Sequence, residues 1–237
     1  METGGNGPMP KDPLQILADE VVACTACSRL TAHCRNMADV KRRAYREWEY
    51  WGKPVPPFGD PAARLFIIGL APAAHGGNRT GRMFTGDRSG DFLYRALYET
   101  GFASQPESQA RGDGLKVTDA YITAAVRCAP PDNKPTPEEF RTCRHYLERE
   151  LALLKNLKCV ATLGKLAFDT YLGILRDGGI IRSRAPYKFG HNVQYEIPGA
   201  AILVGSYHPS QQNTSTGKLT AGMLRDVFER ARSICSS

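Results

Sequence analysis

The chain has 237 residues, of which 42% are hydrophobic and 23% charged, a balance that excludes global disorder and fits one α/β domain of moderate size. Its longest apolar stretch is interrupted by Gly69 and Pro72 and is far shorter than the about 18–20 residues of a membrane helix, and no secretory signal is visible, so we expect a cytoplasmic monomer without membrane contact. Lys and Arg outnumber Asp and Glu by 31 to 24, and the net charge of +7 favours polyanionic partners.

The N-terminal part is predicted to contain a tail and then a helix. Residues 1–12 are rich in Gly, Pro and Asn and are expected to be disordered, with a single α/β domain over 13–237. Asp12 and Pro13 are typical of an N-cap followed by proline in the first turn. The apolar residues that follow repeat at helical spacing, so the first helix should lead into the first cysteine pair.

A second helix is predicted over about 38–48, where Val40, Ala44 and Trp48 would share one side. The surrounding stretch, 29–46, holds six Lys or Arg residues and a single acidic one. Aromatic residues interleave with this charge and follow it. Charge alone leaves two interpretations open, a face that contacts phosphates and a solvated helix surface.

Short apolar runs predict strands at 63–70, 119–126, 159–163, 193–197 and 201–205. Helices are expected up to Gly101, after the Thr136 capping box, after Gly164, and over about 218–234. Strands that alternate with helices indicate a mostly parallel sheet covered on both faces. In such sheets, ligands bind at the loops beyond the carboxyl ends of the strands.

Seven cysteines in a chain without a secretory signal argue against a disulfide framework. Cys24 and Cys27 form a chelating pair, and Cys128 and Cys143 flank a proline-rich loop and the start of the next helix. Four thiolates hold either an iron–sulfur cluster or a structural zinc ion, and the spacing leaves both open beside unrelated buried thiols. Cys159 lies in an apolar strand and is expected to belong to the core.

Two long polar loops follow predicted strands. The first, 69–90, has Arg82 and Met83 where a phosphate-binding loop requires Lys and Ser or Thr, and no dinucleotide or serine-hydrolase motif is present. The second loop carries His208 just after a strand, where a histidine can polarise a carbonyl or stabilise a leaving group. A histidine that merely bonds within its loop is the alternative.

Four segments in order resemble the signatures of family 5 (type B) uracil-DNA glycosylases: YWGKPVPPFGDP, GLAPAAHGGNRTGRMFTGDRSG, VRCAPPDNKPTPEE and HPSQQNTSTGKLT. The resemblance covers about residues 14–232. It implies a three-layer α/β sandwich around a four-stranded, mostly parallel sheet, and a [4Fe–4S] cluster. The ligand pattern of the family falls on Cys24, Cys27, Cys128 and Cys143.

The activity implied by this resemblance is DNA repair. The enzyme would flip uracil, and other deaminated bases such as hypoxanthine, out of double-stranded DNA and hydrolyse the N-glycosidic bond, leaving an abasic site. His208 would donate a hydrogen bond to uracil O2 as negative charge develops there. A non-catalytic iron–sulfur module that recognises lesions without cleaving them is the alternative.

The resemblance also implies the residues around the base. Phe84 would stack on the flipped base, Asn133 would read its edge, and the first loop would line the site with Leu70, Ala71, Pro72 and His75. Related glycosylases place a carboxylate where this chain has Leu70 and Ala71. Asn78 and Asp87 are therefore the candidates for positioning water, with a helix cap as the alternative for Asp87 and hydrogen bonding within the loop as the alternative for His75.

The expected DNA contacts lie mostly in the last long loop. This loop would enter the minor groove beside the lesion, with Gln212 or Asn213 filling the space that the base leaves. Ser210, Lys218 and Arg127 would hold phosphates.

Overall fold

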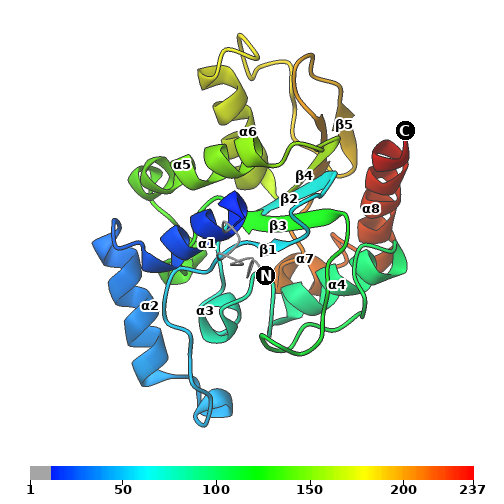
Figure 1. The fold of residues 1–237 in the computed structure, drawn as a ribbon. Coiled ribbons are helices and arrows are strands. Elements are labelled where there is room, and N and C mark those ends of the chain that lie inside the picture. Colours follow the sequence, from blue (N-terminus) through cyan, green and yellow to red (C-terminus); the bar gives the residue numbers. More distant parts are fainter. Residues whose placement is uncertain (1–11) are drawn as a thin grey trace, which may run out of the picture.

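A six-stranded mixed sheet with the order β1-β3-β2-β4-β6-β5 lies at the centre of the computed structural model, which describes residues 12–237 (Figure 1). Its strands are β1 (Phe58–Gly59), β2 (Leu65–Gly69), β3 (Ala120–Ala124), β4 (Cys159–Leu163), β5 (Val193–Tyr195) and β6 (Ile202–Ser206). The predicted tail, except for its last residue, lies outside the described residues. Among those residues, no helix is both long and apolar enough to cross a membrane.

The implied count of four strands is wrong. Strands β3, β2, β4 and β6 form a parallel centre of four, and β1 and β5 extend it as short antiparallel edge strands. The two residues of β1 are too few to carry a periodic pattern. Pairing of Phe58 with Ile122 and of Gly59 with Tyr121 defines that strand, and both partners are distant in sequence.

The helices are α1 (Pro13–Ala23), α2 (Ser28–Val40), α3 (Gly77–Thr80), α4 (Arg88–Glu99), α5 (Pro137–Leu153), α6 (Lys165–Asp177), α7 (Gln211–Ser215) and α8 (Ala221–Ser236), with the 3-10 turns η1 (Arg43–Tyr45) and η2 (Pro131–Asn133). Local capping chemistry is confirmed at two of them. The Asp12 side chain accepts a hydrogen bond from the Leu14 amide at 2.9 Å. Thr136 and Glu139 form the predicted capping box of α5.

The predicted helix over 38–48 is wrong. Helix α2 ends at Val40, Lys41 has a φ of 53°, and the chain then forms η1. Leu30 and Cys34 anchor α2 in a buried cluster, whereas Val40 is 69% exposed and Trp48 is 38% exposed. Without a core beneath them, the apolar residues at helical spacing do not extend the helix.

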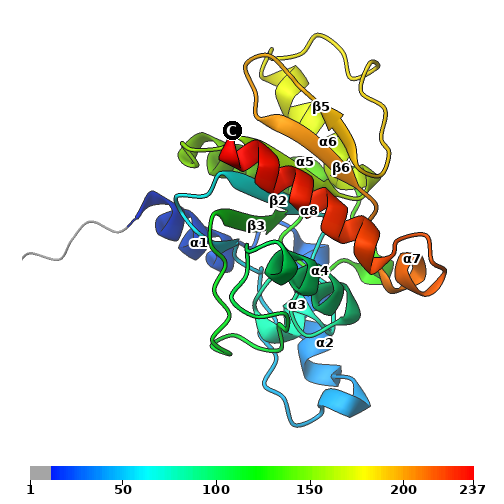
Figure 2. The same cartoon turned by 90° about the vertical axis from the view of Figure 1, so that its right-hand side faces the viewer.

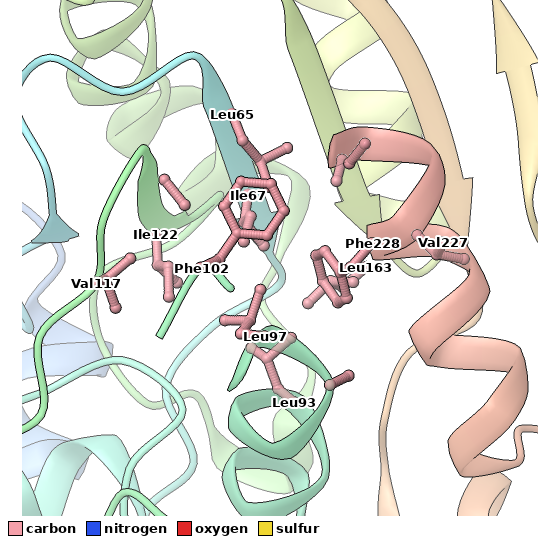
Figure 3. Packing of buried hydrophobic residues seen from close by; sticks show 14 of the residues in the cluster. Leu65, Ile67, Leu93, Leu97, Phe102, Val117, Ile122, Leu163, Val227 and Phe228 are labelled. Carbon is pink, nitrogen blue, oxygen red and sulfur yellow. The ribbon is translucent and has the colours of Figure 1, made fainter. Parts of the chain in front are cut away.

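Helices cover both faces of the sheet (Figures 1 and 2). Successive residues of a strand point to opposite faces. One core, shown in Figure 3, packs β2, β3 and β4 against α4 and α8 through Leu65, Ile67, Ile122, Leu163, Leu93, Leu97, Val227 and Phe228. On the other face, Phe66 and Ile68 pack with Leu147 of α5 and Phe168 of α6. Because β2 is buried on both faces, its sequence is an unbroken run of apolar residues.

Candidate active site

The first loop folds back over the carboxyl end of β2. A side-chain carbon at Gly69 would lie 2.6 Å from Cζ of Phe84, so the Phe84 ring sits where only glycine leaves room for it. Phe84 has a φ of 50°, which is rare for an aromatic residue. Backbone strain of this kind gathers at functional sites. The half-buried ring is therefore held in a specific place above the sheet.

His208 meets Phe84 from the loop after β6. The two ring centroids are 6.1 Å apart. Burial lowers the pKa of His208 to about 4, so its imidazole is neutral near pH 7 and carries one N–H donor. The side-chain amide of Asn213 donates a hydrogen bond to the His208 carbonyl at 2.8 Å, and Gly164 of the loop after β4 packs against the histidine. Three loops from separate strands thus surround the pair of rings.

His191, just before β5, supports the residue that precedes His208. The Tyr207 amide donates to Nδ1 of His191 at 3.3 Å, and Nε2 of His191 lies 3.2 Å from the carbonyl of Met223. A donor at one nitrogen and an acceptor at the other require a neutral ring that is protonated on Nε2. Sequence reasoning missed His191, because no short motif links it to the last loop.

Asp87 caps helix α4, as the alternative interpretation of this residue predicted. Its Oδ1 accepts a hydrogen bond from the Gly90 amide at 3.0 Å. The other carboxylate oxygen lies against Gly76 of the first loop, where an added side-chain carbon would be 1.9 Å away. Burial raises the pKa of Asp87. The cap leaves one carboxylate oxygen directed at the loop.

Asn78 and His75 bond within the protein. Asn78 is fully buried, and its amide donates to the carbonyl of Cys34 at 3.1 Å. His75 is half-buried, and its Nδ1 lies 3.0 Å from the Tyr50 hydroxyl. The His75 carbonyl accepts from Nε of Arg79 at 2.8 Å. The structure therefore places both residues as links between the first loop and the segments packed on it.

The other expected base contacts lie at the same edge of the sheet. The Val126 amide donates to the Leu70 carbonyl at 3.0 Å, which continues the pairing of β2 with β3 beyond the strands. Leu70 and Ala71 are half-buried and Pro72 is buried. Asn133 is exposed on the loop after β3, with a φ of 56°.

The last loop presents short, exposed α7. Ser210 caps this helix by accepting a hydrogen bond from the Asn213 amide at 3.3 Å. Gln212 and Lys218 are exposed, and the Lys218 ammonium lies 5.1 Å from the centre of the Tyr207 ring. The Asn213 side chain, by contrast, is already bonded to the loop carbonyl.

Arg127 does not fit the phosphate contact expected for it. Its side chain is 1% exposed and donates to the buried carboxylate of Glu150 at 2.6 Å, with the Thr123 hydroxyl beside them. A guanidinium without access to solvent offers no hydrogen bond to a DNA phosphate. The sequence shows a basic residue after a strand, but only the fold brings Glu150 of α5 against it.

The four expected ligands, Cys24, Cys27, Cys128 and Cys143, line one pocket between α1, α2, α5 and the loop after β3. Burial raises the pKa of the Cys143 thiol to about 11. Across residues 12–237, no three His, Cys, Asp or Glu side chains gather closely enough to hold a single metal ion. Cys159 is fully buried in β4, as predicted. The four thiols thus line a pocket, and they are too far apart to coordinate one metal ion together.

Comparison with known proteins identifies the family. Residues 56–232 match the uracil DNA glycosylase superfamily. The chain is 48% identical over 212 residues to a type-5 uracil-DNA glycosylase of Thermus thermophilus, covering 90% of this chain and 94% of that protein. It is 46% identical to one of Mycobacterium leprae over 99% of each chain, and 28% identical to a type-4 uracil-DNA glycosylase of Thermotoga maritima over 93% of each. The chain therefore belongs to the uracil-DNA glycosylase superfamily and, within it, to the type-5 uracil-DNA glycosylases.

Proposed function

We propose that this chain removes uracil from DNA by hydrolysing its N-glycosidic bond, leaving an abasic site. The observation that carries the proposal is the meeting of Phe84 and a neutral His208 at the carboxyl edge of the sheet, in a chain of this family. A base flipped out of a duplex needs an aromatic surface to stack on and donors for its edge. Phe84 supplies the surface and His208 supplies a donor.

His208 acts on the leaving group. As the glycosidic bond breaks, negative charge develops on uracil O2, and a preorganised N–H donor stabilises it. Because the pKa of His208 is about 4, the ring is neutral at pH 7 and donates a hydrogen bond without transferring a proton. Asn213 holds the backbone of this histidine, and His191 holds that of the residue before it.

Asp87 positions the attacking water. It keeps a carboxylate oxygen outside its cap, whereas Asn78 is buried and bonded to the main chain. The raised pKa of Asp87 favours acceptance of a proton from that water. Leu70 and Ala71 have no polar side chain that could position water, so within the first loop Asp87 takes this role.

The last loop enters the DNA beside the lesion. Gln212 fills the vacated space, because its side chain is exposed while that of Asn213 is bonded to the His208 carbonyl. Ser210 and Lys218 hold phosphates, and Asn133 reads the edge of the base. The small side chain of Ala71 leaves room for other deaminated bases, such as hypoxanthine.

The activity is tested with an end-labelled duplex that contains one uracil. After incubation with the protein, strand cleavage at that position is expected only when alkali is added, since alkali breaks the strand at an abasic site. A duplex with thymine in place of uracil is the control. Binding without alkali-sensitive sites would support the non-catalytic lesion-recognition module, and cleavage without alkali would contradict simple hydrolysis.

The same proposal includes a structural [4Fe–4S] cluster in the cysteine pocket. A cluster takes one thiolate at each of its four irons, and four thiols that ring a pocket fit that requirement. The ligands would join α1 and α2 to α5 and to the loop that carries Asn133. The cluster would therefore stabilise the fold around the base site.

We expect purified protein to be brown, to absorb at about 400 nm, and to carry about four iron atoms per chain. Cys128→Ser should lower the iron content and the unfolding temperature. Cys235→Ala is the matched control, because Cys235 is buried in α8 away from the pocket. A colourless protein with one zinc ion per chain would contradict the cluster.

A further inference from the structure

Residues 41–51, which we call the basic arm, follow α2 and contain η1. Four of its first six residues are cationic, namely Lys41, Arg42, Arg43 and Arg46, and two glutamates, Glu47 and Glu49, follow them. The three arginines are exposed. Within the described chain, none of the four has an acidic partner in an ion pair.

Several other surface arginines of this protein are balanced by a carboxylate. Arg144, Arg149, Arg176 and Arg225 each form an ion pair with a neighbouring carboxylate. A solvated face normally mixes the two signs of charge in this way, because like charges placed together repel one another. The concentration of unpaired cations on the basic arm therefore calls for an anionic ligand.

Stacking fixes the basic arm to the first loop. The guanidinium of Arg79, in α3, lies 3.9 Å from the centre of the Tyr45 ring and 4.1 Å from that of Trp48. Arg79 is itself buried and also donates to the carbonyls of His75 and Gly86 at 2.8 Å each. Its side chain thus joins the arm to the segment that carries Phe84.

Main-chain hydrogen bonds reinforce this attachment. The Trp51 amide donates to the Arg79 carbonyl at 2.9 Å, and the next amide donates to the Asn78 carbonyl at 3.0 Å. The Tyr50 hydroxyl bonds to His75. The positive charges are consequently held at a set place relative to the base site, as a preorganised surface requires.

A duplex bound at the base site would have to extend past α3 to reach the basic arm. In Figure 2, the segment after α2 that contains η1 lies at the bottom of the molecule, and the exposed helix α7 lies at its right-hand edge. A duplex engaged by α7 and directed toward the bottom of this view would pass the arm. Its phosphates would then meet the arginines of the arm.

We propose that the basic arm is a second contact with the DNA backbone, one that grips phosphates away from the flipped nucleotide. The inference rests on the proposed function, because that function supplies the duplex. Arginine side chains that neutralise phosphates release condensed counterions, so their contribution appears as a salt dependence of binding. Such contacts set the position of the protein on DNA and carry no base specificity.

The test compares two double variants. Arg43→Gln with Arg46→Gln removes two charges from the basic arm. Lys155→Gln with Lys158→Gln removes two exposed charges just before β4, at the opposite end of the strands from the site loops. Affinity for a duplex that contains a stable abasic-site analogue is measured over a series of salt concentrations. The slope of log K against log salt should become shallower by about 0.9 for each phosphate that the arm variant no longer neutralises.

The lysine variant should keep the slope of the unmodified protein, and both variants should keep its single-turnover excision rate at saturating DNA. An unchanged slope in the arm variant would overturn the proposal. Equal changes in the two variants would also overturn it, since they would report net charge alone. The proposal would also be overturned if the basic arm bound an acidic peptide while the arm variant kept the salt dependence of DNA binding unchanged. If excision is absent but the slope changes only in the arm variant, the proposed function fails and the backbone contact stands.

Discussion

Replacing His208 by alanine is expected to lower the single-turnover rate of uracil release by about 10²–10³-fold, as is typical when one preorganised donor to a developing anion is removed. The affinity for a uracil-containing duplex should stay nearly unchanged, because the hydrogen bond strengthens only as charge develops on O2. The chain has no polar side chain at Leu70 or Ala71 that would compensate. Quench-flow excision assays with enzyme in excess measure the rate, and a binding assay with an uncleavable duplex measures the affinity.

Asp87→Asn is the matched comparison. The amide oxygen can still cap α4, so the fold should be retained, and the decrease in rate reports the contribution of the carboxylate to positioning water. If Asp87→Asn abolishes excision in a folded protein while His208→Ala stays active, stabilisation of the leaving group is not the main source of catalysis. Attack by a carboxylate-assisted water would then replace it.

The pH profile separates a neutral His208 from a protonated one. Burial lowers the pKa of His208 from 6.5 to about 4. Between these values the unfolded chain binds more protons than the folded one, so the histidine lowers conformational stability as the pH falls from 6.5 toward 4 and costs nothing above 6.5. The excision rate carried by this residue should therefore not rise as the pH falls from 7 to 6. A rise in that interval would indicate a protonated ring.

The second large effect is expected at the buried pair of Arg127 and Glu150. Glu150→Ala should lower the free energy of unfolding by about 3–5 kcal/mol, because it leaves a buried guanidinium without its counter-charge. Both side chains are at most 1% exposed, and the pair also engages the hydroxyl of Thr123. Urea denaturation followed by circular dichroism measures the change.

Glu229→Ala is the control for this experiment. Glu229 pairs with Arg225 on the surface of α8, where both side chains are about half exposed. Exposed pairs contribute about 0–1 kcal/mol, so this variant should unfold close to the unmodified protein. Similar decreases in the two variants would show that the buried pair is no more important than a surface one.

Local chemistry made much of the fold predictable. The parallel strands are short apolar runs, and the starts of α1 and α5 are marked by side chains that bond to nearby amides, as Asp12 and Thr136 do. The helix expected over 38–48 failed because its periodicity was local while the core that anchors α2, around Leu30 and Cys34, is assembled from distant segments.

The candidate site also has residues that the sequence indicates and residues that only the fold reveals. Phe84 and His208 stand in recognisable motifs, and the sheet brings them together. The burial of Arg127 and the support from His191 depend on partners that follow from three-dimensional packing, Glu150 in α5 and the amide of Tyr207. No spacing in the sequence indicates either pairing.

The cysteine pocket has a consequence for the order in which the protein is made. Cys24 and Cys27 leave the ribosome long before Cys143, which completes the set. Two ion pairs that join α1 and α2 to α5 also require this helix: Glu20 with Arg149, and Arg29 with Glu139. The first two helices add no strand to the sheet, and α1 packs mainly against α5. During translation, α1 and α2 are therefore made early, but their contacts with α5 can form only after more than half of the chain has been synthesised.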